Sequence, residues 1–207
     1  MALTRGRGRH SLATVLPLAL VLLALGSAPP VSSSPGTARV LIQTVRGDIV
    51  VEVDTARAPV TAANFLRYVD GRFYDGGRFH RTVRPGNQPG QAVQIEVVQA
   101  GVSTLRTPAG FPPIALERTN ATGLRHLDGV VSMARDGPDT ATSDFFICIG
   151  DQPALDHGGA RNPDGQGFAA FGRVVKGMAV VRRIQNAAAD GQHLTPGIVI
   201  RSARRLP

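Results

Sequence analysis

Phe79, His80 and Arg81 stand just before a long loop rich in proline and glycine, residues 84–90. Loops run over the surface of a domain and often carry its binding and catalytic groups, so an arginine beside such a loop is a candidate functional residue. A guanidinium stays protonated at physiological pH and presents rigid N–H donors. The alternative is that Arg81 is ordinary surface charge, because most arginines are exposed.

The other reactive residue types form no recognisable catalytic or metal-binding pattern. Ser132 and Ser143 lack the G-x-S-x-G pattern that exposes the serine of a hydrolase. A Ser/His/Asp triad could still assemble from distant residues, although nothing local supports one. Cys148 lies in an apolar run, where a thiol usually packs as a small buried group. The histidines show no metal-ligand spacing, so we expect no metal. No Gly-rich P-loop for binding phosphate is present either.

Short β-strands are the elements expected to position these residues. The runs "ARVLIQTV" (38–45) and "RGDIVVEV" (46–53) predict a hairpin whose turn is Arg46-Gly47-Asp48. Apolar residues at helical spacing predict one helix over 59–70, with Pro59 in its first turn, and a second over 177–186. Further β-type runs lie at 79–83, 93–99, 129–135, 144–149, 168–175 and 197–203.

Eight short strands and two helices favour a mainly β fold. A sandwich or a closed barrel fits better than a parallel α/β sheet, because strands and helices do not alternate regularly. A closed eight-stranded antiparallel β-barrel also leaves no exposed strand edge. In the run 144–149, the adjacent Phe145 and Phe146 must point to opposite faces, so one enters the core and the other needs separate cover, such as a groove.

The first part of the 207-residue chain has the layout of a secretory signal. Three arginines precede the apolar run Leu12–Leu25, and small residues follow it. That run is shorter than the roughly 20 apolar residues of a membrane span. We therefore expect a signal peptide over 1–30, a Ser/Pro linker over 31–37 and one domain over 38–207. An uncleaved N-terminal anchor is the alternative.

Charge and cysteine content narrow the possible partners. The net charge is +8, with three of the positive charges in the signal segment and the rest scattered, so we expect no nucleic-acid partner. A single cysteine excludes an intramolecular disulfide. The protein is expected to be exported, either secreted or N-terminally anchored if the signal is not cleaved, with membrane contact only through the signal segment.

From 38 to 205 the chain resembles the cyclophilins, the peptidyl-prolyl cis-trans isomerase family, of the bacterial exported or periplasmic kind. The resemblance rests on "RGDIVVEV", "APVTAANFLRYV", "YDGGRFHR", "VVQAG", "LDGVVSMAR", "TSDFFICIG", "PALD" and "FAAFGRVVKGM", in the family's order. It implies an eight-stranded antiparallel barrel capped by two helices, and catalysis of rotation about X-Pro bonds during folding of exported proteins. It also implies proline-containing peptide or unfolded substrates, no cofactor and a monomer.

The resemblance also implies a set of site residues. Arg81 would donate to the prolyl nitrogen as the amide twists, Gln99 would bond the substrate backbone, and Phe146 would form the proline pocket, leaving Phe145 for the core. The residues implied to contact the substrate are His80, Val97, Ala134, Arg135, Asp144, Leu155 and Phe168. Glu96 and Val97 align with the family's pocket floor, Asp144 with its usual glutamine, and Phe168 with a position where many members have histidine.

Two other functions remain open at this point. A non-catalytic proline-peptide-binding or holdase-like module would use the same groove. Retention of both Arg81 and Gln99 favours the enzyme, because plain proline binding would need only the apolar pocket. An adhesin that uses Arg46-Gly47-Asp48 is the other alternative, but a Gly-Asp turn needs no partner.

Export is testable directly. The basic and then apolar N-terminus should be removed as the chain crosses the cytoplasmic membrane, because it has the layout of a cleavable signal. N-terminal sequencing of protein from the periplasm should find a start close to the Ser/Pro linker. Recovery of the soluble chain in the cytosol with Met1 intact would contradict the prediction.

Overall fold

The computed structural model describes residues 1–3, 36–105 and 110–207. The predicted signal peptide beyond Leu3, and the predicted linker up to residue 35, lie outside these ranges. The chain separates into two units, residues 1–30 and 31–207, and the elements below all belong to the second. Within the described ranges, no helix has the length and apolar character needed to cross a membrane.

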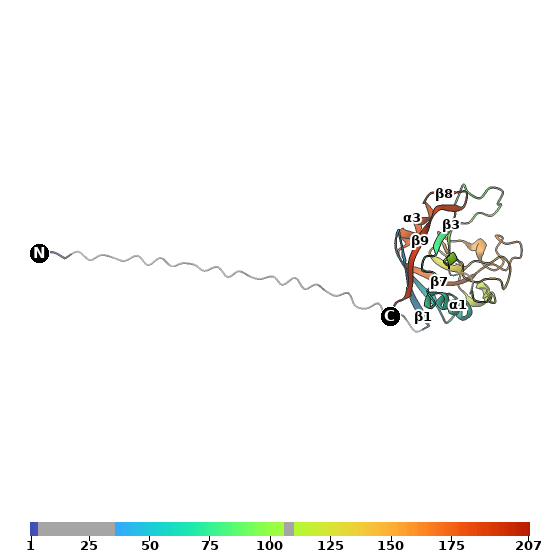
Figure 1. Ribbon diagram of the computed structural model, residues 1–207, viewed down its shortest axis with the longest axis horizontal. Helices are drawn as coiled ribbons and strands as arrows, with labels where there is room; N and C mark the ends of the chain where they lie inside the picture. Colours follow the sequence, from blue (N-terminus) through green and yellow to red (C-terminus); the bar gives the residue numbers. More distant parts are fainter. Residues whose placement is uncertain (4–35, 106–109) are drawn as a thin grey trace. The chain divides into compact units, whose positions relative to one another are not determined.

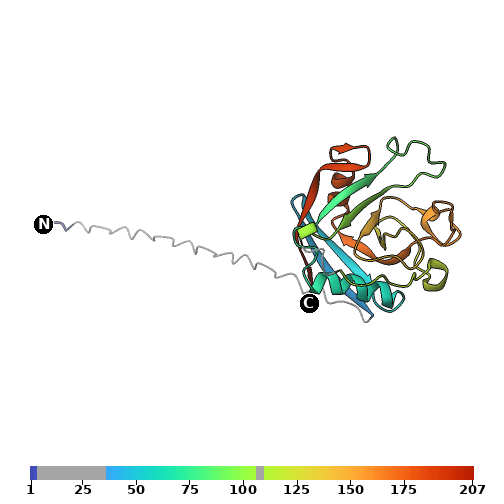
Figure 2. The same cartoon turned by 45° about the vertical axis from the view of Figure 1, so that its right-hand side comes forward.

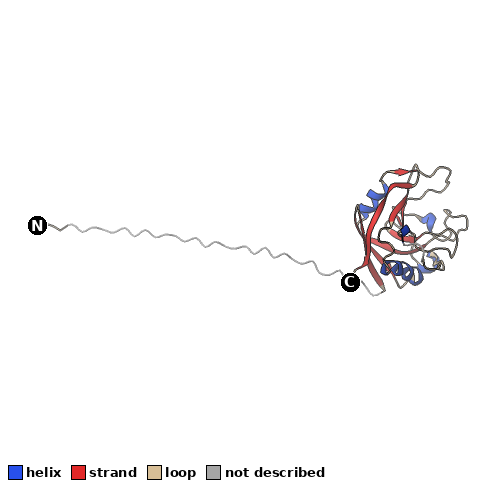
Figure 3. Ribbon diagram, viewed as in Figure 1, coloured by secondary structure: helices blue, strands red, loops and turns tan. Residues whose placement is uncertain are grey.

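Antiparallel strands close into a barrel (Figure 3). The sheet order is β1-β2-β7-β5-β6-β4-β3-β9-β8, and pairing of β1 with β9 closes a ring of eight strands. The short β8 pairs only with the start of β9. The strands are β1 Thr37–Thr44, β2 Gly47–Asp54, β3 Arg78–Val83, β4 Val97–Gly101, β5 Val130–Met133, β6 Phe145–Cys148, β7 Ala169–Lys176, β8 Ala189–Asp190 and β9 His193–Arg205. The predicted closed antiparallel barrel is confirmed.

Two helices, α1 (Pro59–Asp70) and α3 (Met178–Gln185), lie at opposite ends of the barrel (Figures 1 and 2). The first turn of α1 leaves backbone N–H groups without helical partners. The Glu117 carboxylate accepts two of them, from Val60 at 3.1 Å and Thr61 at 2.7 Å, where a negative charge also suits the helix dipole. The bounds of α1 match the prediction, and α3 begins and ends one residue inside the predicted range.

The barrel interior is apolar and rich in aromatic rings. Phe65 of α1 is fully buried and meets Tyr74, Phe145 and Phe171 at ring-centroid distances of 5.1–5.5 Å. The Tyr74 hydroxyl donates to the Ser143 carbonyl at 2.7 Å, so its polar end is satisfied inside the core. Helix α1 therefore packs on one end of the barrel through Phe65, with the buried Tyr68 beside it.

A second apolar cluster lies on the outer face of β4 and β6. Its buried members are Val83, Ile95, Val97, Phe146, Cys148 and Leu155. Side chains alternate along a strand, so Phe145 and Ile147 enter the core while Phe146 and Cys148 face outward. This confirms the opposite orientations of the two phenylalanines. Cys148 is buried and desolvation raises its pKa, so it packs as a small apolar group, as predicted.

Some predicted elements are wrong in detail. The run 93–99 was expected to be a strand, but β4 begins only at Val97. The Gln88 amide bonds both the N–H and the C=O of Ile95, at 3.1 and 2.9 Å, so these backbone groups are taken by a side chain. Helix α2 (Thr119–Thr122), the 3₁₀ helix η2 (Pro153–Leu155) and β8 were missed, because such short elements carry no readable periodicity.

The Phe65 contacts predict a large stability effect. Phe65→Ala should lower the free energy of unfolding by about 3–5 kcal/mol, because it leaves a cavity among three aromatic rings. Val60, on the same helix, is 44% exposed, so Val60→Ala should change it by about 0.5 kcal/mol or less. Denaturant unfolding of the three proteins measures both effects. Similar losses in the two variants would contradict the proposed anchoring by Phe65.

Candidate active site

A hollow of about 440 Å³, here called the main hollow, lies over the outer apolar cluster. Every sequence-predicted site residue except His80 lines it, namely Arg81, Val97, Gln99, Ala134, Arg135, Asp144, Phe146, Leu155 and Phe168. These residues come from β3, β4, β6, η2 and the segments that follow β5 and precede β7. The barrel therefore brings together side chains that are far apart in the sequence.

The floor of the main hollow is apolar. Phe146 is 5% exposed, and the Phe168 ring stands edge-on to it, with centroids 5.3 Å apart and an interplanar angle of 88°. Val97 and Leu155 are buried beside Phe146. Aromatic pairs prefer such edge-to-face arrangements, which hold the two rings in place. The floor can take a small apolar ring.

Ile95, not Glu96, completes this floor. The sequence resemblance placed Glu96 there, but its carboxylate accepts a hydrogen bond from the Gln185 amide of α3 at 2.8 Å. Ile95 is 6% exposed and lines the main hollow together with Val97. Successive side chains along an extended backbone point to opposite sides, so Glu96 turns away from the face that Ile95 and Val97 share. The floor is therefore less polar than the aligned sequence indicated.

Arg81 is held at the wall of the main hollow by two amide side chains. Its Nε and Nη2 donate to Gln192 Oε1 at 2.9 and 2.7 Å, and its Nη1 donates to Gln99 Oε1 at 3.1 Å. The β3 register shifts between Phe79 and Arg81, an irregularity that re-aims side chains at a strand position. Burial and the nearby Arg161 lower the pKa of Arg81, but an arginine remains protonated. The guanidinium is thus fixed by neutral partners that leave its charge intact.

Gln99 extends this contact to Asp144 and His80. Gln99 Nε2 donates to Asp144 Oδ2 at 3.3 Å, and His80 Nε2 lies 3.6 Å from the same oxygen. His80 does not line the main hollow, so it reaches the site only through Asp144. Gln192 was missed from the sequence: it lies 111 residues from Arg81, in the β8–β9 turn, and no local pattern marks it.

Ser132, His126 and Asp156 form a hydrogen-bonded set behind Phe146, in which Ser132 and His126 are buried. His126 Nδ1 is 2.7 Å from Asp156 Oδ1, and His126 Nε2 is 2.9 Å from Ser132 Oγ. Burial alone would raise the pKa of Asp156, but hydrogen bonds from His126 lower it overall. The order of groups resembles a hydrolase triad, yet Ser132 is 0% and His126 1% exposed, so a substrate has no access to the hydroxyl. The His126 ring stacks on Phe146 at 6.1 Å and 14°, so the set supports the floor from behind.

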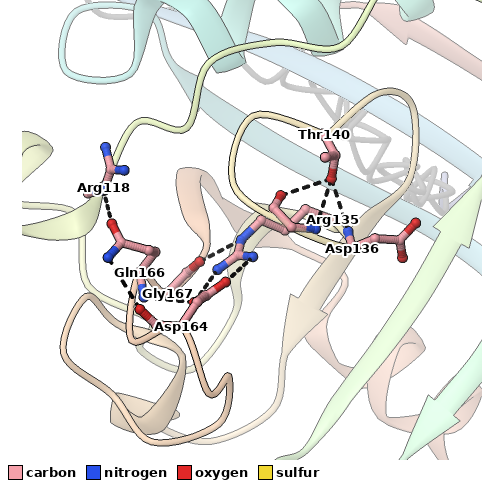
Figure 4. Close-up of polar contacts among 8 residues, drawn as sticks. Arg118, Arg135, Asp136, Thr140, Asp164, Gln166 and Gly167 are labelled. Carbon is pink, nitrogen blue, oxygen red and sulfur yellow. Dashed lines mark hydrogen bonds and ion pairs between the residues drawn. The ribbon is translucent and has the colours of Figure 1, made fainter.

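Arg135 ties a loop to the edge of the main hollow (Figure 4). Its side chain is 1% exposed, and Nη1 and Nη2 donate to the two Asp164 carboxylate oxygens at 2.7 and 2.9 Å. Its Nε donates to the Gly167 carbonyl at 2.9 Å, and its guanidinium carbon lies 5.1 Å from the Phe168 ring centroid. The bond from Arg135 lowers the pKa of Asp164. The Arg135 side chain thus fixes the segment that carries Phe168.

Metal ligation has no support in the described ranges. No three side chains among histidine, cysteine, aspartate and glutamate gather there in a way that could hold a metal ion. The charged groups around the main hollow include Arg81 and Arg135, held by amides or a carboxylate, and Asp144, which accepts a bond from Gln99. The main hollow therefore offers hydrogen-bond donors and positive charge above an apolar floor. The Ser132 hydroxyl is buried and is not available as a nucleophile.

Comparison with known proteins gives a consistent result. Residues 39–205 match the family model described as cyclophilin type peptidyl-prolyl cis-trans isomerase/CLD. The chain is 37% identical over 178 residues to peptidyl-prolyl cis-trans isomerase A of Dickeya dadantii, covering 85% of this chain and 86% of that protein. It is 34% identical over 157 residues to peptidyl-prolyl cis-trans isomerase B of Escherichia coli, covering 74% and 89%.

Solved structures support the same fold. A crystal structure of a cyclophilin type peptidyl-prolyl cis-trans isomerase of Cryptosporidium parvum aligns with a TM-score of 0.66 at 22% identity, covering 83% of this chain and 98% of that chain. A second structure of that protein, in the presence of the dipeptide Ala-Pro, gives a TM-score of 0.64 at 22% identity, covering 80% and 97%.

The Arg135 contacts predict a local effect on the loop before β7. Arg135→Lys keeps the charge but cannot reach both Asp164 oxygens and the Gly167 carbonyl together. The segment that carries Phe168 then loses part of what holds it, so amide hydrogen exchange over 164–168 should accelerate about 3- to 10-fold. Arg173→Lys is the matched control, because the Arg173 side chain is 68% exposed. Unchanged exchange over 164–168 in Arg135→Lys would show that the loop is held by other contacts.

Proposed function

This chain belongs to the cyclophilin-type peptidyl-prolyl cis-trans isomerases, and we propose that it acts on proline-containing segments of exported proteins, through the main hollow and with Arg81 as the central catalytic group. The single observation that carries the assignment of the site is the Arg81 guanidinium, held by Gln99 and Gln192 at the wall of an apolar floor. The proposed substrates are peptides or unfolded chains.

The reaction sets the physical requirement for the site. Rotation about a peptide bond has a barrier of about 18–20 kcal/mol because the C–N bond has partial double-bond character. X-Pro bonds exchange uncatalysed in tens to hundreds of seconds, which is slow enough to limit folding. No covalent step is needed. The protein accelerates rotation by binding the twisted amide more tightly than either planar isomer.

Arg81 provides an interaction that exists mainly in the twisted state. As the amide twists, resonance is lost and the prolyl nitrogen gains a lone pair that an N–H donor can meet. The Gln192 and Gln99 carbonyl oxygens fix the guanidinium in advance, so little reorganisation is needed during the reaction. Because both partners are neutral, the positive charge is not cancelled by a carboxylate.

The apolar floor and Gln99 hold the substrate for this step. Phe146, Leu155 and Val97 offer a surface on which the proline ring can pack, and Phe168 closes one side. The Gln99 amide nitrogen carries two N–H donors, and the contact with Asp144 uses one of them. The second donor is available for a substrate carbonyl. Ala134 and the Arg135 backbone line the adjoining wall, along which the peptide lies.

The proposed site of action is the periplasm, reached through the predicted signal segment. The basic and then apolar N-terminus supports export, and an uncleaved segment would instead anchor the domain to the membrane. The proposed state is a monomer, which the closed barrel favours because closure leaves few open strand edges for pairing with another copy. No cofactor is needed for bond rotation by this mechanism.

Arg81→Ala tests the assignment of the site. The variant should keep its fold and lose about 10²- to 10³-fold in kcat/KM, which corresponds to about 2.7–4 kcal/mol for one preorganised donor. A prolyl-peptide isomerisation assay measures the loss, and peptide titration measures binding separately. Arg201→Ala removes an equal charge from an exposed position and should have full activity.

The outcomes separate the enzyme from a binding module. A folded Arg81→Ala protein with unchanged kcat/KM would contradict the role of Arg81. A wild-type protein that binds proline peptides but does not speed their isomerisation would support the non-catalytic, holdase-like alternative instead.

A further inference from the structure

A second hollow adjoins the main hollow, and Arg81 and Arg161 line both. This side hollow has a volume of about 580 Å³. Its other lining residues are Asn87, Gln88, Pro89, Gln91, Asp190, Gly191, Gln192 and His193. A peptide whose proline occupies the main hollow would continue past Arg81 into a region walled mostly by amide groups.

The loop 84–96 builds one wall of the side hollow and is internally fixed. Gln88 is 3% exposed, and its Nε2 donates to the carbonyls of Arg84 and Ile95 at 3.1 and 2.9 Å. Its Oε1 accepts the Ile95 N–H at 3.1 Å. Asn87 Nδ2 joins the loop to the β8–β9 turn by donating to the Gly191 carbonyl at 3.0 Å. The wall is therefore held by side-chain bonds at both ends of the loop.

Arg161 crosses to this wall from the loop before β7. Its Nη1 donates to the Val93 carbonyl at 2.7 Å and lies 3.3 and 3.4 Å from the Oε1 atoms of Gln91 and Gln88. Within residues 36–105 and 110–207, its Nε and Nη2 make no hydrogen bond, and no carboxylate lies within salt-bridge distance of it. Three N–H donors of a fixed guanidinium are thus open to a ligand.

The charges around Arg161 leave its positive charge uncompensated. Arg81 also has only amide partners, and burial together with Arg161 lowers its pKa. Burial lowers the pKa of Arg161 as well. The carboxylates that line the two hollows are Asp136, Asp144 and Asp190, and none of them forms an ion pair with either arginine. A ligand carboxylate between the two guanidiniums would relieve their mutual repulsion.

We propose that the side hollow is a substrate subsite in which Arg161 selects an acidic side chain on a residue next to the X-Pro dipeptide. This inference rests on the proposed isomerase function of the main hollow. A carboxylate accepts two parallel N–H bonds from a guanidinium, an arrangement stronger and more specific than a bond between neutral groups. A lysine in the same position would meet two like charges.

The test uses peptides with an Ala-Pro core and one variable residue, either directly before the alanine or directly after the proline. The variable residue is Glu, Gln or Lys, and exchange is followed by NMR, which needs no protease. At low ionic strength, kcat/KM for the Glu peptide should exceed that for the Gln peptide about 2- to 5-fold at one of the two positions, with Lys lowest. The preference should shrink at high salt.

Two variants assign the preference to Arg161. Arg161→Gln should bring the Glu/Gln ratio to about one, whatever its effect on the uncharged peptide. Arg201→Gln removes an equal charge from an exposed position of β9, eight residues beyond His193, and should keep the wild-type ratio. A ratio of one in the wild type at both positions, or a preference that survives in Arg161→Gln, would overturn the proposal.

Failure of the subsite and failure of the enzyme give different results. The Gln peptides measure isomerase activity in the absence of a negative charge on the variable residue. If the wild-type protein does not isomerise them, the proposed function is contradicted but the subsite is not. Titration of the Glu and Gln peptides then still decides the subsite, because tighter binding of the Glu peptide that disappears in Arg161→Gln supports it. Equal binding of the two peptides overturns it.

Discussion

The pairing of β9 with both β1 and β3 is the constraint on which the structure depends. At one end β9 runs antiparallel to β1 and closes the barrel, and at the other it pairs with β3 as far as Arg81 opposite His193. The turn before β9 then places Gln192 against the Arg81 guanidinium. The same strand, β9, therefore closes the sheet and orients Arg81.

Because side chains alternate along a strand, β4 and β6 supply residues both to the barrel interior and to the main hollow. Val98, Ala100, Phe145 and Ile147 fill the barrel, while Val97, Gln99 and Phe146 form the floor and wall of the main hollow. A slip of β4 by one residue against β6 would turn Val98 and Ala100 outward and would bury Gln99 without partners in the core. The site therefore requires the same register as the core, and the stability of the core fixes the geometry of the site.

Neutral partners and restricted access decide which polar groups can act. Arg81 and Arg161 are oriented by amide oxygens, so their charges remain available to a ligand. The guanidinium of Arg135 is instead paired with Asp164 and serves to hold the loop before β7. Ser132, His126 and Asp156 have the contacts of a triad, but Ser132 and His126 are buried, so a substrate cannot reach the hydroxyl. Geometry alone does not make a catalytic group, because a substrate must also reach it.

The sequence by itself determined the local elements and the composition of the site. The hairpin of β1 and β2, helix α1 and the opposite orientations of Phe145 and Phe146 follow from periodicity, which is a property of neighbouring residues. The motif resemblance named nine residues that line the main hollow, together with His80, which does not, and it missed Ile95 and Arg161, which do.

Only the tertiary structure decided how distant residues combine. Four contacts of the site join segments that are far apart in the chain. They are the Arg81–Gln192 bond, the bond of Glu96 to Gln185, the set around His126, and the contact of Arg161 with the loop 84–96. The buried Gln88 likewise keeps the first residues of the predicted strand 93–99 in a loop by bonding Ile95. Such contacts depend on chain closure and on competition between side-chain and backbone hydrogen bonds, and neither leaves a periodic signal in the sequence.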